Sequence, residues 1–206
     1  MSSPARKHNK PLLATRQNTF FTSLHALAMA ILPLLALPAA AEEEDSCLAL
    51  IPRSLENALN EAFPKFRAPL TTDNLSEDVE WELKQGRQGC MGLAIGDFDG
   101  DAANDRLLAL TPLHGSGGLV VVALARGDTW KFHSLSEWRG PRETLYVSTA
   151  QPGIYQRTES LDGPLEPGEV ETLDCPRTVA IFGQTASSGV AYCYNDGSWQ
   201  YAWISD

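Results

Sequence analysis

Hydrophobic residues follow a helical period before residue 90 and a strand period after it. Between Pro52 and Phe63 they fall at i, i+3, i+4, i+7 and i+8, which places them on one face of a helix. A second, weaker helix is predicted from Ser76 to Gln85, ending before Gly86, with Val79 and Leu83 turned toward the core. The sequence therefore predicts one or two helices ahead of a β-rich region.

The segment from Leu119 to Ala125 is a nearly continuous apolar run, which is typical of a central strand buried on both faces. Turns rich in glycine, proline and asparagine separate this run from other apolar segments. We expect those segments to be strands as well: 91–95, 106–111, 129–135, 144–149, 154–157, 178–183, 190–194 and 199–204. The predicted fold is α+β, an antiparallel sheet of about seven to nine strands preceded by one or two helices.

The first 41 residues have the composition of a secretory signal peptide. They contain four basic residues and no acidic ones, then an apolar stretch from Leu24 to Leu37, then Ala39-Ala40-Ala41. A membrane anchor is the alternative, but Pro33 interrupts the apolar stretch and a span needs about 20 apolar residues. We expect a signal peptide over 1–41, a single domain over 42–206, a periplasmic or secreted location, and no membrane attachment after cleavage.

Four cysteines lie in the expected domain: Cys47, Cys90, Cys175 and Cys193. They include no C-x-x-C pair, so a zinc site or a thioredoxin-like motif is a poor interpretation. An even number of cysteines in an oxidising compartment indicates two disulfides. Three pairings are open; we favour Cys47 with Cys90 and Cys175 with Cys193, because each pair closes a contiguous segment.

Without the four basic residues of the signal peptide, the domain carries 12 basic against 26 acidic side chains, a net charge of −14. A nucleic-acid-binding surface needs a basic footprint, so this balance argues against nucleic acid as a partner. It favours cations and basic protein surfaces instead.

Four aspartates occupy odd-numbered positions of one short loop. Asp97, Asp99, Asp101 and Asp105 stand at loop positions one, three, five and nine, and Ala103 could add its backbone carbonyl. Oxygen ligands in this number suit a hard cation, and Ca²⁺ in particular. An aspartate-rich turn that holds no metal is the alternative.

The run Gly-Asp-Phe-Asp-Gly-Asp at 96–101 resembles the loop of FG-GAP and VCBS repeats, written GDFDGDGxxD, which binds calcium between two strands. The resemblance covers about twenty residues. Such loops usually recur in β-propeller blades, but the motif occurs once here and a propeller needs at least four blades of about 40 residues. Ala102 replaces the glycine that allows a left-handed bend, so we expect weak calcium binding, on the order of 10⁻⁴–10⁻³ M.

Aromatic residues are concentrated near the C-terminus. In a strand, Trp199, Tyr201 and Trp203 would share one face. That face is either part of the core or an exposed strip that binds a sugar or a protein partner. His133 lies in a strand pattern and is interpreted as a solvent-facing residue.

The sequence contains no nucleophile elbow, and its one dense carboxylate cluster is better explained by a cation. The pattern of residues 42–206 resembles small secreted bacterial proteins of no settled function. We therefore expect an exported, non-enzymatic, calcium-stabilised binding or inhibitor module with an unknown protein or glycan partner. The alternative is a small periplasmic hydrolase with a structural calcium, which would need two carboxylates in a pocket away from residues 97–105.

Overall fold

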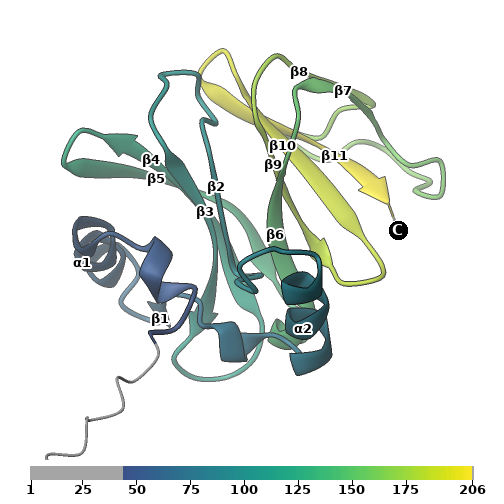
Figure 1. Ribbon diagram of the computed structural model, residues 1–206. Coiled ribbons are helices and arrows are strands. Elements are labelled where there is room, and N and C mark those ends of the chain that lie inside the picture. The colour runs from purple at the N-terminus through teal and green to yellow at the C-terminus, as the bar shows by residue number, and fades with distance from the viewer. Residues whose placement is uncertain (1–43, 206) are drawn as a thin grey trace, which may run out of the picture. The chain divides into compact units, whose positions relative to one another are not determined.

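The computed structural model describes residues 44–205 (Figure 1). The predicted signal peptide lies outside these residues. Within the described part, no helix is long and apolar enough to cross a membrane.

Residues 44–205 form two α-helices, three short 3₁₀-helices and eleven strands. In chain order these are η1 (Leu48–Leu50), α1 (Arg53–Ala62), β1 (Phe66–Arg67), η2 (Thr71–Asp73), α2 (Ser76–Lys84), β2 (Leu93–Gly96), β3 (Asp105–Pro112), β4 (Gly118–Arg126), β5 (Thr129–Trp138), η3 (Arg142–Thr144), β6 (Leu145–Ala150), β7 (Gly153–Gln156), β8 (Thr172–Cys175), β9 (Val179–Gln184), β10 (Gly189–Asn195) and β11 (Ser198–Ser205).

The strands form three antiparallel sheets. One has the order β1-β3-β4-β5, with β2 also paired to β3; the second has the order β11-β10-β9-β6; the third is the β7–β8 hairpin. The α+β class is confirmed, but the prediction of one sheet with about seven to nine strands is wrong. Strands β1 and β8 were not predicted because they are too short to show an alternation of apolar and polar residues. The division into separate sheets begins at residues 139–144, where the chain leaves the first sheet and Pro141 has no N–H to donate to a neighbouring strand.

The main core lies between the two large sheets. Phe98, Leu107 and Val122 from the first sheet and its loop pack in one cluster with Phe182 and Tyr192 from the second. Strand β4 is buried on both faces, as its apolar run predicted, because alternate residues face this core and the opposite side of the sheet.

The outer face of each large sheet is also covered. Helix α1 places Leu55 and Leu59 against the first sheet, and the β7–β8 hairpin places Leu173 against the second. The helix forms where its apolar period predicted it. Replacing the fully buried Leu55 by alanine would cost about 2–5 kcal/mol of unfolding free energy.

Helix α2 is the loosely packed element. It begins and ends close to the predicted residues, and Gly86 follows it with a φ of 74°. None of its nine residues is buried, and Leu83 is 54% exposed and Trp81 55%. The prediction that Leu83 faces the core is therefore wrong: strands fill the core between the sheets, and α1 and the β7–β8 hairpin cover the outer faces.

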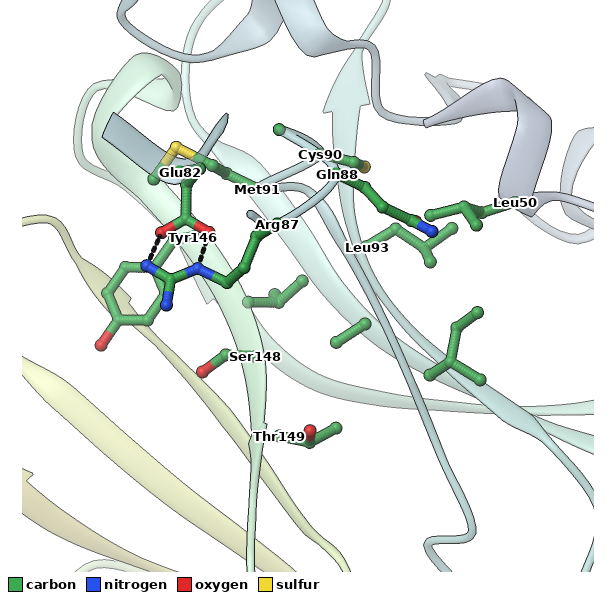
Figure 2. Close-up of a pocket in the computed structure, with 14 residues that line it drawn as sticks. Leu50, Glu82, Arg87, Gln88, Cys90, Met91, Leu93, Tyr146, Ser148 and Thr149 are labelled. Carbon is green, nitrogen blue, oxygen red and sulfur yellow. Dashed lines mark hydrogen bonds and ion pairs between the residues drawn. The ribbon is translucent and has the colours of Figure 1, made fainter. Parts of the chain in front are cut away.

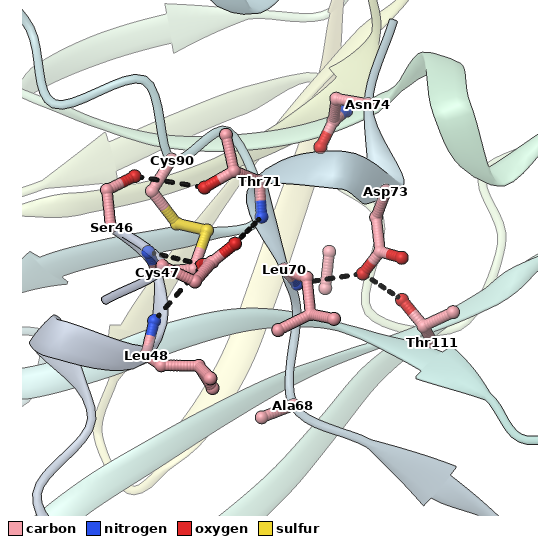
Figure 3. Close-up of a disulfide and its surroundings, with 12 residues drawn as sticks. Ser46, Cys47, Leu48, Ala68, Leu70, Thr71, Asp73, Asn74, Cys90 and Thr111 are labelled. Carbon is pink, nitrogen blue, oxygen red and sulfur yellow. Dashed lines mark hydrogen bonds between the residues drawn. A yellow bond between two sulfur atoms is a disulfide. The ribbon is translucent and has the colours of Figure 1, made fainter. Parts of the chain in front are cut away.

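The first predicted disulfide is confirmed. Cys47 and Cys90 are bonded across 43 residues and join the segment before α1 to the segment before β2 (Figure 3). Closing a loop of this length stabilises the fold by about 4 kcal/mol in the chain-entropy account. Cys175 and Cys193 are adjacent and buried, but they are thiols and not a disulfide.

A buried cation joins the two large sheets. Arg142 donates from Nε to the Thr111 hydroxyl (3.0 Å) and from its two terminal nitrogens to the carbonyls of Leu145 (3.2 Å) and Ala109 (3.1 Å). The Thr111 hydroxyl in turn donates to Asp73 (2.8 Å; Figure 3), and the Asp73 carboxylate lies 3.9 Å from Arg142. This network holds β3 and β6 together at one end of the interface between the sheets.

Candidate functional site

The aspartate loop connects β2 to β3 and is folded by its own carboxylates. Asp97 accepts hydrogen bonds from the backbone N–H groups of Gly100 (2.7 Å) and Ala102 (3.0 Å). Asp101 accepts one from Ala103 (2.8 Å). These bonds turn the chain so tightly that several carboxylates lie close together.

Ala102 has a φ of 67°, which is the left-handed bend expected at the sixth loop position. Its Cβ makes that conformation unfavourable by about 1 kcal/mol relative to glycine. The strain expected from the departure at this position is therefore confirmed.

Asp105 is completely buried at the start of β3. Burial raises its pKa to about 6, and the neighbouring Asp99 and Asp101 add to the rise, while hydrogen bonds from two backbone N–H groups oppose it. Those donors are Phe98 (2.9 Å) and Ala125 (2.8 Å), so Asp105 ties the loop to the end of β4.

Three of the predicted ligands come together. Asp97, Asp99 and Asp105 each place one carboxylate oxygen within 4.8 Å of the others. Asp101 is not in this group; Arg126 binds its carboxylate (2.9 Å) and also pairs with Asp99. The structure thus brings three of the predicted carboxylates together. It also places Arg126, which the sequence analysis did not predict, against the loop.

Three carboxylate oxygens fit a hard cation such as Ca²⁺. Arg126 comes from the end of β4 and already balances part of the negative charge, so a metal would compete with its guanidinium for Asp99. Arg177 also contacts the loop, by donating to the backbone carbonyl of Asp99. Neither arginine follows from the loop motif, because their proximity depends on sheet packing.

A groove opens between β2 and β6 (Figure 2). It has a volume of about 630 Å³, and we call it the β2–β6 groove; its lining includes Leu50, Met91, Ile95, Val147 and Thr149. At one end the N–H of Val147 donates to the carbonyl of Met91 (2.9 Å). From that point the two strands diverge, as Figure 2 shows.

A second cavity, of about 490 Å³, lies beside α2 and contains Asp78, Trp81, Glu82 and Tyr146. Glu82 is held by an ion pair with Arg87 (2.7 Å from Nη2 to Oε1; Figure 2), and that guanidinium stacks 4.8 Å from the Trp81 ring centroid. One carboxylate oxygen of Asp78 is buried and has no hydrogen-bond partner among the described residues. Burial raises the pKa of Tyr146.

A third, smaller cavity of about 310 Å³ lies on the other side of α2, beside Val79 and Leu83. In the described part of the chain, these three hollows all border α2. The large exposed side chains of Trp81 and Leu83 therefore stand among concave surfaces.

The C-terminal aromatic residues have a different place. Trp199, Tyr201 and Trp203 are partly buried and pack against the core between the sheets, and Tyr201 stacks on Tyr192 with ring centroids 5.0 Å apart. This packing favours the core alternative over an exposed strip. His133 is partly buried as well, which lowers its pKa, and its Nε2 has no hydrogen-bond partner among the described residues; it is not the solvent-facing residue expected.

No family model matches the chain, and comparisons with curated proteins and with solved structures found no match either. The resemblance of the loop to FG-GAP and VCBS repeats therefore remains a prediction.

Proposed function

We propose that this chain is an exported, non-enzymatic binding or inhibitor module that takes a protein or glycan partner on the surface around α2. The observation that carries the proposal is the position of α2: it has no buried side chain and is bordered by three hollows. Exposed Trp81 and Leu83 at such a surface are typical of a binding site, because contacts with aromatic and apolar anchors in concave surroundings dominate binding energy.

Export to the periplasm or the medium is supported by the signal-like N-terminus and by the disulfide between Cys47 and Cys90. Disulfides persist in oxidising compartments and are rare in the cytosol.

The binding surface can be tested by site-specific photo-crosslinking in cells. A photoreactive residue in place of Trp81 should crosslink a partner, while one in place of Ile154, which is 66% exposed on β7, should not. Equal yields at the two positions, or no product at Trp81, would contradict the proposal.

We also propose that the aspartate loop takes up calcium, through Asp97, Asp99 and Asp105. The affinity is expected on the order of 10⁻⁴–10⁻³ M, because Ala102 is strained and Arg126 competes for Asp99. At tenfold excess over the dissociation constant, bound calcium would stabilise the fold by about 1.4 kcal/mol.

The calcium proposal is tested by thermal unfolding with calcium added from zero to about ten millimolar, the upper extracellular range. The melting temperature of the wild type should rise and that of Asp97→Asn should not. Magnesium is the control, since its smaller octahedral shell suits this loop less well. A wild-type melting temperature that calcium leaves unchanged would refute the site.

The hydrolase alternative has one specific observation in its favour. Asp78 and Glu82 line the same cavity away from the aspartate loop, together with Tyr146. Glu82 is already occupied by its ion pair with Arg87, however, whereas one carboxylate oxygen of Asp78 has no hydrogen-bond partner among the described residues, so Asp78 is the acid to test. Hydrolysis of chromogenic glycosides or esters that disappears in Asp78→Asn, in a variant with unchanged thermal stability, would favour the enzyme over the binding module.

A further inference from the structure

Strand β6 has one paired edge and one edge that faces the β2–β6 groove. The N–H of Val147 donates to Met91, so the backbone of Val147 points away from β9, the partner of β6 in its sheet. The carbonyl of Leu145 points the same way, since it accepts a hydrogen bond from Asn74 (2.8 Å). Alternation along a strand then directs the N–H and C=O of Thr149 into the groove.

Strand β2 presents the opposite edge. The carbonyl of Gly92 accepts from Ala109 on β3 (2.9 Å), so Gly92, Ala94 and every second residue face β3. The backbone groups of Leu93 and Ile95 consequently face β6, and both residues line the groove. Within residues 44–205, no backbone hydrogen bond joins β2 to β6; the bond from Val147 reaches Met91, two residues before β2.

Beyond the bonds at Val147 and Leu145, two strand edges without a backbone partner among residues 44–205 thus flank one groove. A row of free N–H and C=O groups is the binding site that an extended peptide needs, because the peptide supplies the complementary groups of a new strand. The side chains fit the same occupant: Met91 and Val147 are apolar but buried in the groove floor, and Ile95, 37% exposed, is the apolar side chain open to an occupant.

Charge specifies the occupant further. Strand β2 leads directly from the groove into the aspartate loop, where Asp97 is partly exposed. The domain as a whole carries a net charge of −14. A segment with lysine or arginine at the end nearest Asp97 would complement this field, whereas an acidic segment would be repelled.

We propose that the β2–β6 groove binds an extended, basic segment of a partner protein as an added β-strand, held by the free backbone groups of Ile95 and Thr149. The proposal rests on the proposed binding function and specifies its partner: a strand from a protein, not a glycan. Apolar side chains of the segment, alternating along it, cover Ile95.

The probe is a peptide of eight residues with alternating threonine and valine and two lysines at one end. It is titrated into ¹⁵N-labelled protein in a chelating buffer, and amide shifts are followed. Binding should shift the amides of Ile95 and Thr149 most. Methylating the peptide nitrogens that would donate to the groove should weaken binding at least about tenfold, the size of one backbone hydrogen bond. Replacing the lysines by glutamates should also weaken it.

A proline substitution tests the protein side. Thr149→Pro removes an N–H that points into the groove without removing a ladder bond to β9, and it should weaken binding about tenfold. Ile154→Pro is the matched control. The N–H of Arg157 donates to the carbonyl of Glu171 across the β7–β8 hairpin, so by alternation along β7 the N–H of Ile154 points away from β8 and makes no bond of that ladder. Thermal unfolding checks both folds, and the methylated peptide decides the question if Thr149→Pro does not fold.

Undiminished binding of the methylated peptide, main shifts outside the groove, or no binding would overturn the proposal. Tight binding of the glutamate peptide would overturn the assignment of a basic partner. If light scattering finds a dimer that Thr149→Pro dissociates, the occupant is a second copy of this chain and the proposal is wrong. If Thr149→Pro leaves the yield of the partner crosslinked at Trp81 unchanged, the proposed strand addition is wrong, but the proposed binding function is not. If the peptide binds but nothing is crosslinked at Trp81, the proposed binding surface around α2 is wrong, and the proposal for the β2–β6 groove is not contradicted.

Discussion

Replacing Arg142 by methionine should destabilise the fold strongly, because it removes the cation that joins β3 to β6. Arg142 is 8% exposed, and its guanidinium satisfies the carbonyls of Ala109 and Leu145 as well as the Thr111 hydroxyl. Methionine keeps most of the volume but leaves the Ala109 carbonyl and the Thr111 hydroxyl without this donor, whereas the Leu145 carbonyl keeps its hydrogen bond from Asn74 (2.8 Å). Each such group costs about 1–3 kcal/mol.

The expected total is smaller than the sum of those costs. Removing one partner of a buried ion pair costs about 3–5 kcal/mol, and here Asp73 keeps its hydrogen bond from Arg67 (2.8 Å). The lower end, about 3 kcal/mol of unfolding free energy, is therefore expected. For a domain of this size it corresponds to a fall in melting temperature of roughly 6–12 °C.

Urea unfolding followed by tryptophan fluorescence measures the effect. The midpoint should fall while the slope stays unchanged, because the same surface is exposed on unfolding. Arg139→Met, an exposed arginine three residues earlier, is the matched control and should change stability by less than about 0.5 kcal/mol. A loss below about 1 kcal/mol for Arg142→Met would refute the reasoning, since it would mean that water replaces the guanidinium at no cost.

Three further predictions follow from the packing. Burial raises the pKa of Asp73, but hydrogen bonds from Arg67 and other neighbours outweigh burial and hold the pKa below the ordinary value of 3.8. The contribution of the Asp73 carboxylate to the unfolding free energy is therefore complete above pH 3.8 and is lost as the pH falls through the lowered pKa. Urea midpoints below about pH 4 should fall more for the wild type than for Asp73→Asn. Ala102→Gly should raise the unfolding free energy by about 0.5–1 kcal/mol even without calcium, because it relieves the left-handed strain; an unchanged or lower midpoint would contradict this. Under denaturing, non-reducing conditions, alkylation should label two thiols per chain, Cys175 and Cys193, because the structure holds them as free cysteines; a chain without labelled thiols would show that the second predicted disulfide forms after all.

Several features could be predicted because neighbouring residues determine them. The apolar period from Pro52 to Phe63 specifies α1, and the continuous run of β4 specifies a strand buried on both faces. The aspartate spacing specifies a tight loop, and the bend at Ala102 follows from its position in that loop. In each case a backbone period or a local hydrogen bond is sufficient.

Features that depend on contacts between distant segments needed the tertiary structure. The division of the strands into three sheets, the approach of Arg126 to Asp99, and the network of Arg142 all join residues far apart in the chain. Leu83 is a residue for which the local pattern gave the wrong answer. Its position in the helix favours burial, but no core is left for α2 to cover. The β2–β6 groove exists because β2 and β6 belong to different sheets that meet at one hydrogen bond and then diverge, and no local pattern encodes that divergence.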